Sequence, residues 1–461
     1  MMTLAINDKQ KVLQAIQSGT IDAASISFPT IIDDILLYMN ERGILKDLEG
    51  SIEDKRTTNK SIPLSTILSL AIAAKMKLKT ALTDVPFAIS DAQLLSALGV
   101  NIYDQDRDIL TQGIYEEGVT RNLINKYTAK EFINFYNQYL NESILAKHID
   151  APTIHIFDCT KIQVNIKNNK YEKSEVVKID GEAVRGYKLA SLRGLLDVSG
   201  IIEEIEFGSI KTHDLELSRN LLLNTPHFKS GDILINDRGF ISRDIINTLK
   251  IDKQVDIYVP AKKNMNIYDV AVSIAKEQDK WSKHPNKKRS NQTIQIVKDL
   301  GMYWEGDKEK EDVPINACVV KDIKNDEYYV FLTTDTSKTA RQIIQIYELR
   351  PEIEEDFRQL KDFWNLEDFK STKYNFILFH IVATLIGYSY FQIYINTEEG
   401  MKYQKKSLPI IIKNYSNKKE KNVVIYKGQY FGIFKFIEFL DLYATCNSEI
   451  RLRLAPVLTQ V

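Results

Sequence analysis

The pattern of apolar residues changes near Thr153, and this change constrains the fold more than any other feature of the sequence. Before Thr153, apolar residues recur every three or four positions in segments such as FPTIIDDILLYMNERGIL, which is typical of amphipathic helices. After it, VRGYKLASLRGLLDVSGIIEEIEFGS has the pattern of two long strands joined by a turn at 197–200. The strand-like runs DILIND and VDIYVPA then alternate with helical segments. Strands and helices in this order predict an α/β fold, in which a mixed sheet is flanked by helices.

The same patterns divide the chain into regions. We expect a helical N-terminal domain at residues 1–150 and a sheet domain at 151–261 that resumes at 326–395. The strand-like pieces TIQIVKDLGMYW and INACVVKDI predict a β-rich insertion at 262–325. A basic C-terminal extension follows at 396–461.

Two helices after the hairpin have recognisable starts. The segments THDLELSRNLLLN and SRDIINTLK predict helices capped by Thr212 and Ser242, because short hydroxyl side chains favour the N-cap position.

The segment Tyr374–Ile395 has 22 residues without Asp, Glu, Lys or Arg and is long enough to cross a bilayer. We favour a buried helix, because the segment stands alone and contains polar residues such as Asn375, His380 and Gln392. A membrane span is the alternative, and it predicts that the protein sediments with lipid.

Charge and cysteine content restrict the class of protein. Lys and Arg number 61 against 62 Asp and Glu, so any nucleic-acid contact must come from local basic patches. Cys159, Cys318 and Cys446 lie far apart and lack the paired spacing of a zinc motif or a disulfide framework, and the first residues lack a secretory pattern. We therefore expect a cytoplasmic protein in a reducing compartment.

Two carboxylates end strand-like runs. Asp158 follows IHIF and Asp237 follows ILIN, which places both at the edge where α/β sheets usually bind ligands. Each Asp taken alone is equally typical of a turn. The six histidines are scattered, and no HExxH, P-loop or GxSxG motif indicates zinc proteolysis, nucleotide hydrolysis or serine hydrolysis.

A third acid lies within a stripe of polar residues. Tyr347, Arg350, Glu354 and Lys361 have helical spacing, although Pro351 is suited to the first turn of a helix rather than to its interior. We therefore expect a turn that carries Tyr347 and Arg350 and feeds a helix. Glu354 taken alone has the sequence context of a solvated helix acid.

Three carboxylates from two strands and a helix have the ligand chemistry to hold two divalent metal ions during phosphoryl transfer, and Mg²⁺ prefers oxygen ligands of this kind.

The spacing in YELRPEIEEDFRQLK, together with IHIFDCT and INDRGF, resembles the signature of bacterial insertion-sequence transposases of the DDE type. The match is to the branch that excises DNA through hairpins and carries a Tyr-Arg-Glu-Lys motif. It covers roughly residues 150 to 395, and the N-terminal part matches more loosely.

The resemblance implies a ribonuclease-H-like core in which Asp158, Asp237 and Glu354 bind two Mg²⁺ ions. It implies as well that Mn²⁺ can replace Mg²⁺. It also implies that Tyr347, Arg350 and Lys361 contact double-stranded DNA, although salt bridges along a helix would explain the same residues. The protein would then cut and paste an insertion sequence at its terminal inverted repeats, as a homodimer on DNA in the nucleoid.

Related enzymes place an aromatic residue from the β insertion against a base flipped out near the cleavage point. Trp281 and Trp304 are the candidates, and a place in the hydrophobic core is the alternative for each. His213 with Asp214 would either lie beside the site or cap a helix.

Two basic runs, Lys280–Lys298 and Met401–Lys427, would either neutralise DNA phosphates or form solvated loops.

Other functions remain consistent with the sequence. A metal-dependent nuclease of the same fold would cut DNA without joining it, and an inactive relic would bind DNA without cutting it.

Overall fold

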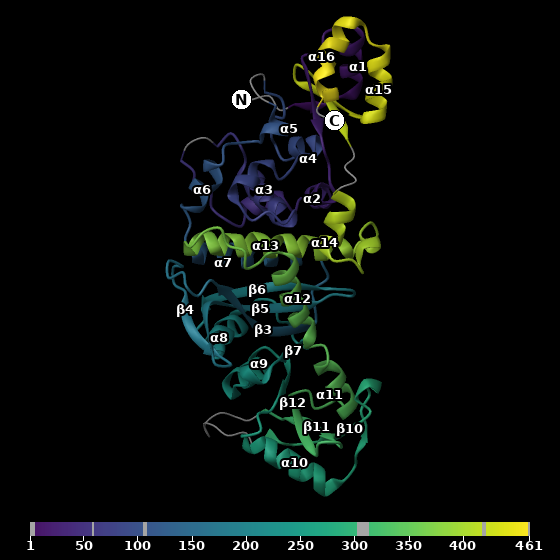
Figure 1. Ribbon diagram of the computed structural model, residues 1–461. Helices are drawn as coiled ribbons and strands as arrows, with labels where there is room; N and C mark the ends of the chain where they lie inside the picture. The colour runs from purple at the N-terminus through teal and green to yellow at the C-terminus, as the bar shows by residue number, and fades with distance from the viewer. Residues whose placement is uncertain (1–4, 58–59, 105–107, 302–312, 417–420, 460–461) are drawn as a thin grey trace. The chain divides into compact units, whose positions relative to one another are not determined.

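The computed structural model describes residues 5–57, 60–104, 108–301, 313–416 and 421–459 (Figure 1). Its contacts divide the chain into two compact units. Unit 1 comprises Met1–Tyr139 and Leu360–Val461, and unit 2 comprises Leu140–Gln359.

The centre of unit 2 is a mixed sheet with the strand order β6-β5-β3-β7-β8. These strands are β3 (Ile154–Val164), β5 (Glu182–Leu195), β6 (Gly200–Ser209), β7 (Ile233–Asn236) and β8 (Asp256–Pro260). β3, β5 and β6 pair antiparallel, whereas β3, β7 and β8 pair parallel. This arrangement confirms the predicted α/β class and is consistent with a ribonuclease-H-like core.

Five more strands extend the same sheet. They are β4 (Glu175–Ile179), β9 (Ser282–Lys283), β10 (Gln292–Val297), β11 (Asn316–Asp322) and β12 (Glu327–Thr333). β4 pairs with the first residues of β5, and β12 pairs antiparallel with the end of β8. The strands of the predicted insertion therefore continue the main sheet.

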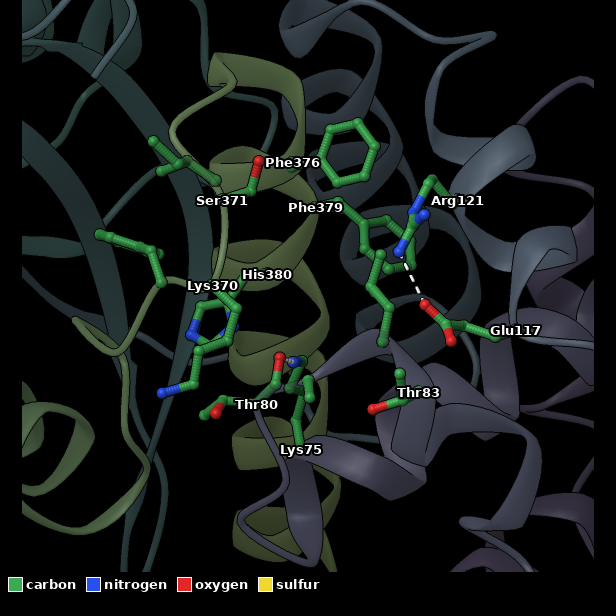
Figure 2. A pocket seen from close by; sticks show the side chains of 14 residues that line it. Lys75, Thr80, Thr83, Glu117, Arg121, Lys370, Ser371, Phe376, Phe379 and His380 are labelled. Atoms are coloured by element: carbon green, nitrogen blue, oxygen red, sulfur yellow. Dashed lines mark hydrogen bonds and ion pairs between the residues drawn. The ribbon is translucent and has the colours of Figure 1, made fainter. Parts of the chain in front are cut away.

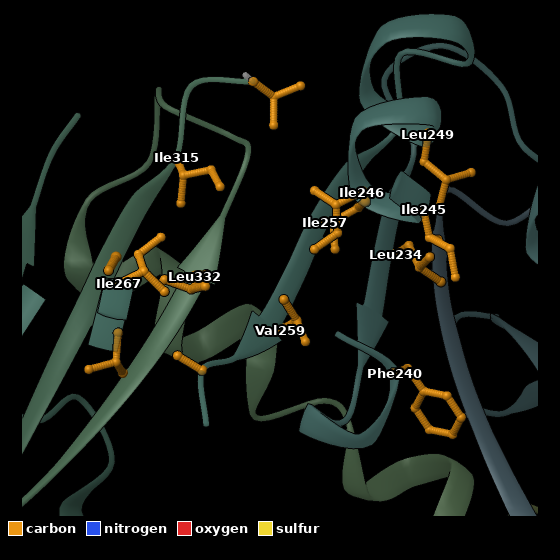
Figure 3. Close-up of a cluster of buried hydrophobic side chains, with 14 of the residues drawn as sticks. Leu234, Phe240, Ile245, Ile246, Leu249, Ile257, Val259, Ile267, Ile315 and Leu332 are labelled. Atoms are coloured by element: carbon orange, nitrogen blue, oxygen red, sulfur yellow. The ribbon is translucent and has the colours of Figure 1, made fainter. Parts of the chain in front are cut away.

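Helices flank this sheet. The helices of unit 2 include α8 (Asp214–Asn224), α9 (Arg243–Asp252), α10 (Asn266–Gln278) and α11 (Ala340–Tyr347), and α12 (Pro351–Phe363) runs across the boundary between the units. A buried apolar cluster joins α8, α9 and α10 to the strands, and Figure 3 shows Ile245, Ile246 and Leu249 of α9 facing Leu234 and Ile257. Because side chains alternate along a strand, Leu192 joins this cluster while Arg193 points to the opposite face.

The N-cap residue was predicted for α8 and for α9, and the structure differs from the prediction for α8. α9 has Ser242 at its N-cap, as predicted, although the side chain makes no capping hydrogen bond. α8 was predicted to be capped by Thr212, and this is wrong. The cap is His213, whose Nδ1 accepts a hydrogen bond from the backbone N–H of Leu215 at 3.2 Å. A neutral imidazole nitrogen is an acceptor like a hydroxyl oxygen, which explains the shift of one residue.

Unit 1 contains a four-stranded sheet built from both ends of the sequence. Its order is β1-β14-β13-β2, with β1 (Ile6–Asn7), β2 (Ala23–Ser27), β13 (Asn422–Lys427) and β14 (Tyr430–Lys435). The prediction for the first 150 residues is a helical domain with few strand signals, so β1 and β2 are a correction. Both strands are short, and their partners lie at the other end of the sequence, outside any local pattern.

The other regular elements described in unit 1 are helices. Three helices, α1 (Lys9–Gln17), α15 (Phe436–Thr445) and α16 (Ser448–Thr459), share an apolar core with the small sheet. The remaining α-helices are α2 (Ile31–Glu41), α3 (Leu64–Met76), α4 (Ala92–Ala97), α5 (Ile109–Gln112), α6 (Gly118–Ile124), α7 (Ala129–Gln138), α13 (Tyr374–Ile395) and α14 (Leu408–Ile411).

α13 contacts α3, α7 and α2. It is the one helix in the described ranges that is long and apolar enough to cross a membrane, and 94% of its most apolar window is buried. The predicted buried helix is therefore confirmed. A single such helix is weak evidence for a membrane span, because the core helix of a globular protein has the same composition.

Candidate active site

Asp158 and Asp237 lie side by side at one point of the sheet. β3 and β7 run parallel, and their last paired residues are Phe157 and Asn236. The residue after each of them is an Asp: Asp158, which is still within β3, and Asp237, which follows the end of β7. Asp158 was predicted to end its strand, and this is wrong, because β3 continues to Val164 by pairing with β5. Asp158 lies instead where the pairing of β3 with β7 ends.

The third acid comes from α12. This helix begins at Pro351, as predicted, and Glu354 lies in its first turn. Tyr347 is the last residue of α11, so Arg350 belongs to the short connection between the two helices. The four residues of the polar stripe therefore do not share one helix.

Arg350 joins all three acids. Its Nη2 lies 2.9 Å from Oδ2 of Asp158 and 3.9 Å from Oδ2 of Asp237. Its Nη1 pairs with Oε1 of Glu354. The carboxylates predicted from separate parts of the sequence are thus brought together around one guanidinium.

The three acids differ in their exposure. The side chain of Asp158 is 13% exposed and that of Glu354 is 53% exposed. Burial raises the pKa of Asp158 to about 6, although Arg350 and the backbone N–H of Cys159 act in the opposite direction. Burial also raises the pKa of Tyr347, whose ring packs against Phe331 with 4.7 Å between the centroids.

The donor set fits a divalent cation in its chemistry, since carboxylate oxygens are the preferred protein ligands of Mg²⁺. Among the residues described, however, no three His, Cys, Asp or Glu side chains are spaced to hold a metal ion together. The guanidinium of Arg350 lies between the three carboxylates.

The comparison with known proteins identifies the family. A family model described as the transposase DDE domain matches residues 153–389, about half of the chain. The chain belongs to this family. No curated protein matches the chain.

Membership in the DDE family makes the protein a transposase that acts on DNA, and such enzymes typically use a divalent metal ion. The matched region begins at the start of β3 and includes Asp158, Asp237 and Glu354.

One residue of the DDE domain that the sequence did not reveal is Arg193. It is 2% exposed and reaches from β5 to α12, where its Nε donates to Asp356 at 2.5 Å and its Nη2 donates to Glu352 at 3.1 Å. These two acids lie on either side of Glu354, so Arg193 positions the helix that carries the third acid. The signal in the sequence is a lone Arg within an apolar strand, YKLASLRGLL.

The other predicted residues of the DDE domain have different surroundings. Lys361 lies seven residues after Glu354 on α12, and its Nζ is 3.8 Å from Oε1 of Glu367. Asp214 pairs with Lys188 at 2.6 Å. His213 and Asp214 thus begin α8, and His213 caps it.

The two tryptophans have different outcomes. Trp281 is partly buried and packs against the main apolar cluster, with its ring centroid 6.2 Å from that of Tyr328. Trp304 lies outside the described residues.

A separate pocket of about 290 Å³ lies in unit 1 (Figure 2). Its lining combines aromatic and basic side chains, including Phe369, Phe376, Phe379, Lys75, Arg121 and Lys370. Arg121 pairs with Glu117 at 2.7 Å, and burial lowers the pKa of Lys75 to about 8. The three acids joined by Arg350 do not line this pocket.

Proposed function

We propose that this protein is the transposase of an insertion sequence and that it cuts and pastes its element at terminal inverted repeats. The observation that supports the proposal most directly is the convergence of Asp158, Asp237 and Glu354 on one guanidinium in a domain of the DDE family.

In this proposal the three acids hold two Mg²⁺ ions, and Mn²⁺ is able to replace them. When bound, the ions would lower the pKa of the attacking hydroxyl and stabilise the charge that develops on the phosphate. The acids themselves supply the negative charge and the oxygen donors for this role.

The reaction begins with a nick. Water attacks the phosphorus at the end of the element, the bond to the 3′ oxygen breaks, and the strand is left with a free 3′ hydroxyl. That hydroxyl attacks the phosphorus at the junction in the opposite strand, the bond to the 3′ oxygen of the flanking DNA breaks, and the flanking DNA leaves with a 3′ hydroxyl. The hairpin formed on the element is then hydrolysed, which regenerates the 3′ hydroxyl of the element. The same hydroxyl then attacks a phosphorus of target DNA, the bond to the target's 3′ oxygen breaks, and the element is joined to the target strand.

Tyr347, Arg350 and Lys361 contact the DNA in this proposal. An arginine offers paired donors that match phosphate oxygens, and a lysine offers a mobile point charge. The phenol of Tyr347 is able to donate to a backbone oxygen or to stack.

Other regions have proposed roles as well. Residues 1–150 bind the ends of the element, and the basic residues of 396–461 bind DNA or the second subunit. The protein acts as a homodimer on nucleoid DNA in the cytoplasm, without a membrane.

The test is a cleavage assay with labelled DNA that carries the two ends of the element, in Mg²⁺. Wild-type protein is expected to give nicks, hairpins and joined products, which a denaturing gel separates. Asp158→Ala, Asp237→Ala and Glu354→Ala are each expected to give none. Glu355→Gln is the matched control, because Glu355 neighbours Glu354 in sequence and pairs with Arg358 on the exposed side of α12.

The outcomes distinguish the alternatives. Cleavage without hairpins or joined products would support the nuclease, and binding without cleavage would support the inactive relic. Normal cutting by any of the three alanine variants would show that the acid does not belong to the site.

A further inference from the structure

We propose that Arg350 is an internal counter-cation of the acid site, which a metal ion must displace and which then becomes available to a DNA phosphate. The inference rests on the proposed metal-binding role of Asp158, Asp237 and Glu354. Displacement of Arg350 would couple the binding of the metal ion to the binding of DNA.

The contacts of Arg350 are those that a metal ion would need. Its two terminal nitrogens approach Oδ2 of Asp158, Oδ2 of Asp237 and Oε1 of Glu354. A cation held by all three carboxylates at once would have to lie between them, in the space that the guanidinium fills. Arg350 and a metal ion therefore compete for one set of ligands.

The charges of the site explain why a divalent ion is able to displace Arg350 from the carboxylates. Three carboxylates and one guanidinium leave an excess of negative charge, and the partly buried position of Asp158 strengthens the attraction for any cation. A divalent ion carries twice the charge of Arg350 and is able to contact the oxygens directly.

One hydrogen bond that Arg350 does not make favours its release. Its Nε is buried and has no hydrogen-bond partner among the described residues. An unmade hydrogen bond of a buried polar group destabilises this position of the side chain. Electrostatic attraction to the acids, rather than a complete set of hydrogen bonds, holds Arg350 in place.

Release has a consequence for DNA. A displaced guanidinium next to the acids is free to bind a phosphate with paired donors. Metal binding then raises the affinity for DNA, and by linkage DNA raises the affinity for metal by the same factor.

The first experiment measures Mn²⁺ binding to the full chain without DNA, by titration calorimetry and by electron paramagnetic resonance of free Mn²⁺. Arg350→Gln is expected to bind Mn²⁺ about tenfold more tightly than wild type, because the competing cation is gone. Asp158→Asn is expected to bind more weakly. Arg238→Gln is the matched control, since Arg238 is exposed and follows Asp237 directly, and its affinity is expected to stay near that of wild type.

The results separate two failures. If Asp158→Asn binds Mn²⁺ like wild type, the proposed metal site is wrong. If Asp158→Asn binds more weakly but Arg350→Gln does not bind more tightly, the counter-cation role is wrong while the metal site stands. An equal gain in Arg350→Gln and Arg238→Gln would show a general charge effect and would also overturn the counter-cation role.

Thermal melting gives a second readout that does not need activity. Without metal, Arg350→Gln is expected to melt below wild type because the three carboxylates repel one another, and Mn²⁺ is expected to raise its melting temperature more than that of wild type. If Arg350→Gln does not fold, Arg350→Lys replaces it. Lys keeps the charge but loses the paired geometry, so its Mn²⁺ affinity is expected to lie between wild type and the tenfold gain. An Arg350→Lys affinity equal to wild type would then count against the role.

The link to DNA is tested by fluorescence anisotropy with a short labelled duplex of arbitrary sequence, with EDTA or with Mn²⁺. Mn²⁺ is expected to increase the affinity of wild type more than that of Arg350→Gln. An equal increase in both proteins would overturn the coupling.

Discussion

Arg193 and Asp356 form a buried ion pair that ties the central sheet to α12. The Nε of Arg193 lies 2.5 Å from Oδ2 of Asp356, and the two residues are 2% and 5% exposed. One residue comes from β5 and the other from the helix that carries Glu354. The position of the third acid therefore depends on a contact that lies outside the acid site.

Removing this contact is expected to destabilise unit 2. Arg193→Ala leaves Asp356 buried without its guanidinium partner, and breaking a buried pair in this way costs about 3 to 5 kcal/mol. The melting temperature of Arg193→Ala should be several degrees below that of wild type. Cleavage activity should fall further than stability alone predicts, because α12 is no longer held.

The double variant Arg193→Met with Asp356→Leu is the control for Arg193→Ala. Replacing both charges by apolar groups is expected to recover much of the stability, since a buried pair is often no better than an apolar contact. A melting temperature of Arg193→Ala equal to wild type would contradict the positioning role.

Gly200, at the start of β6, is expected to accept no larger residue. A Cβ on Gly200 would overlap the guanidinium of Arg193. Gly200→Ala should therefore displace Arg193 and destabilise the protein by about 1 to 3 kcal/mol, as overpacking of a core does, and so lower its melting temperature. Gly239→Ala is the matched control, because a Cβ there meets no atom within 4 Å. Equal melting of the two variants would show that Arg193 moves aside without loss.

His155 is expected to make stability depend on pH. Burial lowers the pKa of His155, but Glu203 at 2.6 Å and Asp232 at 3.4 Å raise it, so that it reaches about 9 against an ordinary value near 6.5. A raised pKa means that the charged imidazole stabilises the fold fully below about pH 6.5 and that this contribution is lost as the pH rises through about 9.

The measurement compares melting temperatures of wild type and His155→Gln across this pH range. Wild type should be the more stable protein near pH 6, and the difference should shrink towards pH 9. Parallel curves for the two proteins would mean that His155 does not change its charge on unfolding in this range.

Trp281 is expected to stabilise the fold by packing in the hydrophobic core. Because its ring packs against the apolar cluster and near Tyr328, Trp281→Ala should destabilise the protein by about 2 kcal/mol, and Trp281→Phe should retain most of the stability. Thermal melting checks both variants. A Trp281→Ala protein that melts like wild type but makes no hairpins would instead favour contact with a flipped base.

Much of unit 2 is predictable because its signals are local. The hairpin of β5 and β6, the strands β7 and β8, and the start of α12 at Pro351 each follow from residues within a short window. The adjacency of Asp158 and Asp237 follows from two strands that pair in parallel. The contacts of Arg350 were not predictable, because spacing along the chain does not show which carboxylates a long side chain will reach.

Contacts between distant segments account for the other differences. The pairing of β12 with β8 places the insertion strands on the main sheet, and only the three-dimensional register reveals it. Arg193 was missed for the same reason, because a single charged residue in a strand does not indicate its partner on a helix about 160 residues later.

The small sheet of unit 1 has a consequence for the order in which the chain folds. β2 pairs with β13, and Ile26 lies opposite Val423, so a ribosome must add about 400 residues before this pairing is possible. All residues of unit 2 have been synthesised by then. During synthesis the apolar residues of β2 and α1 therefore remain without their packing partners. At this stage the nascent chain is most exposed to aggregation or to the action of chaperones.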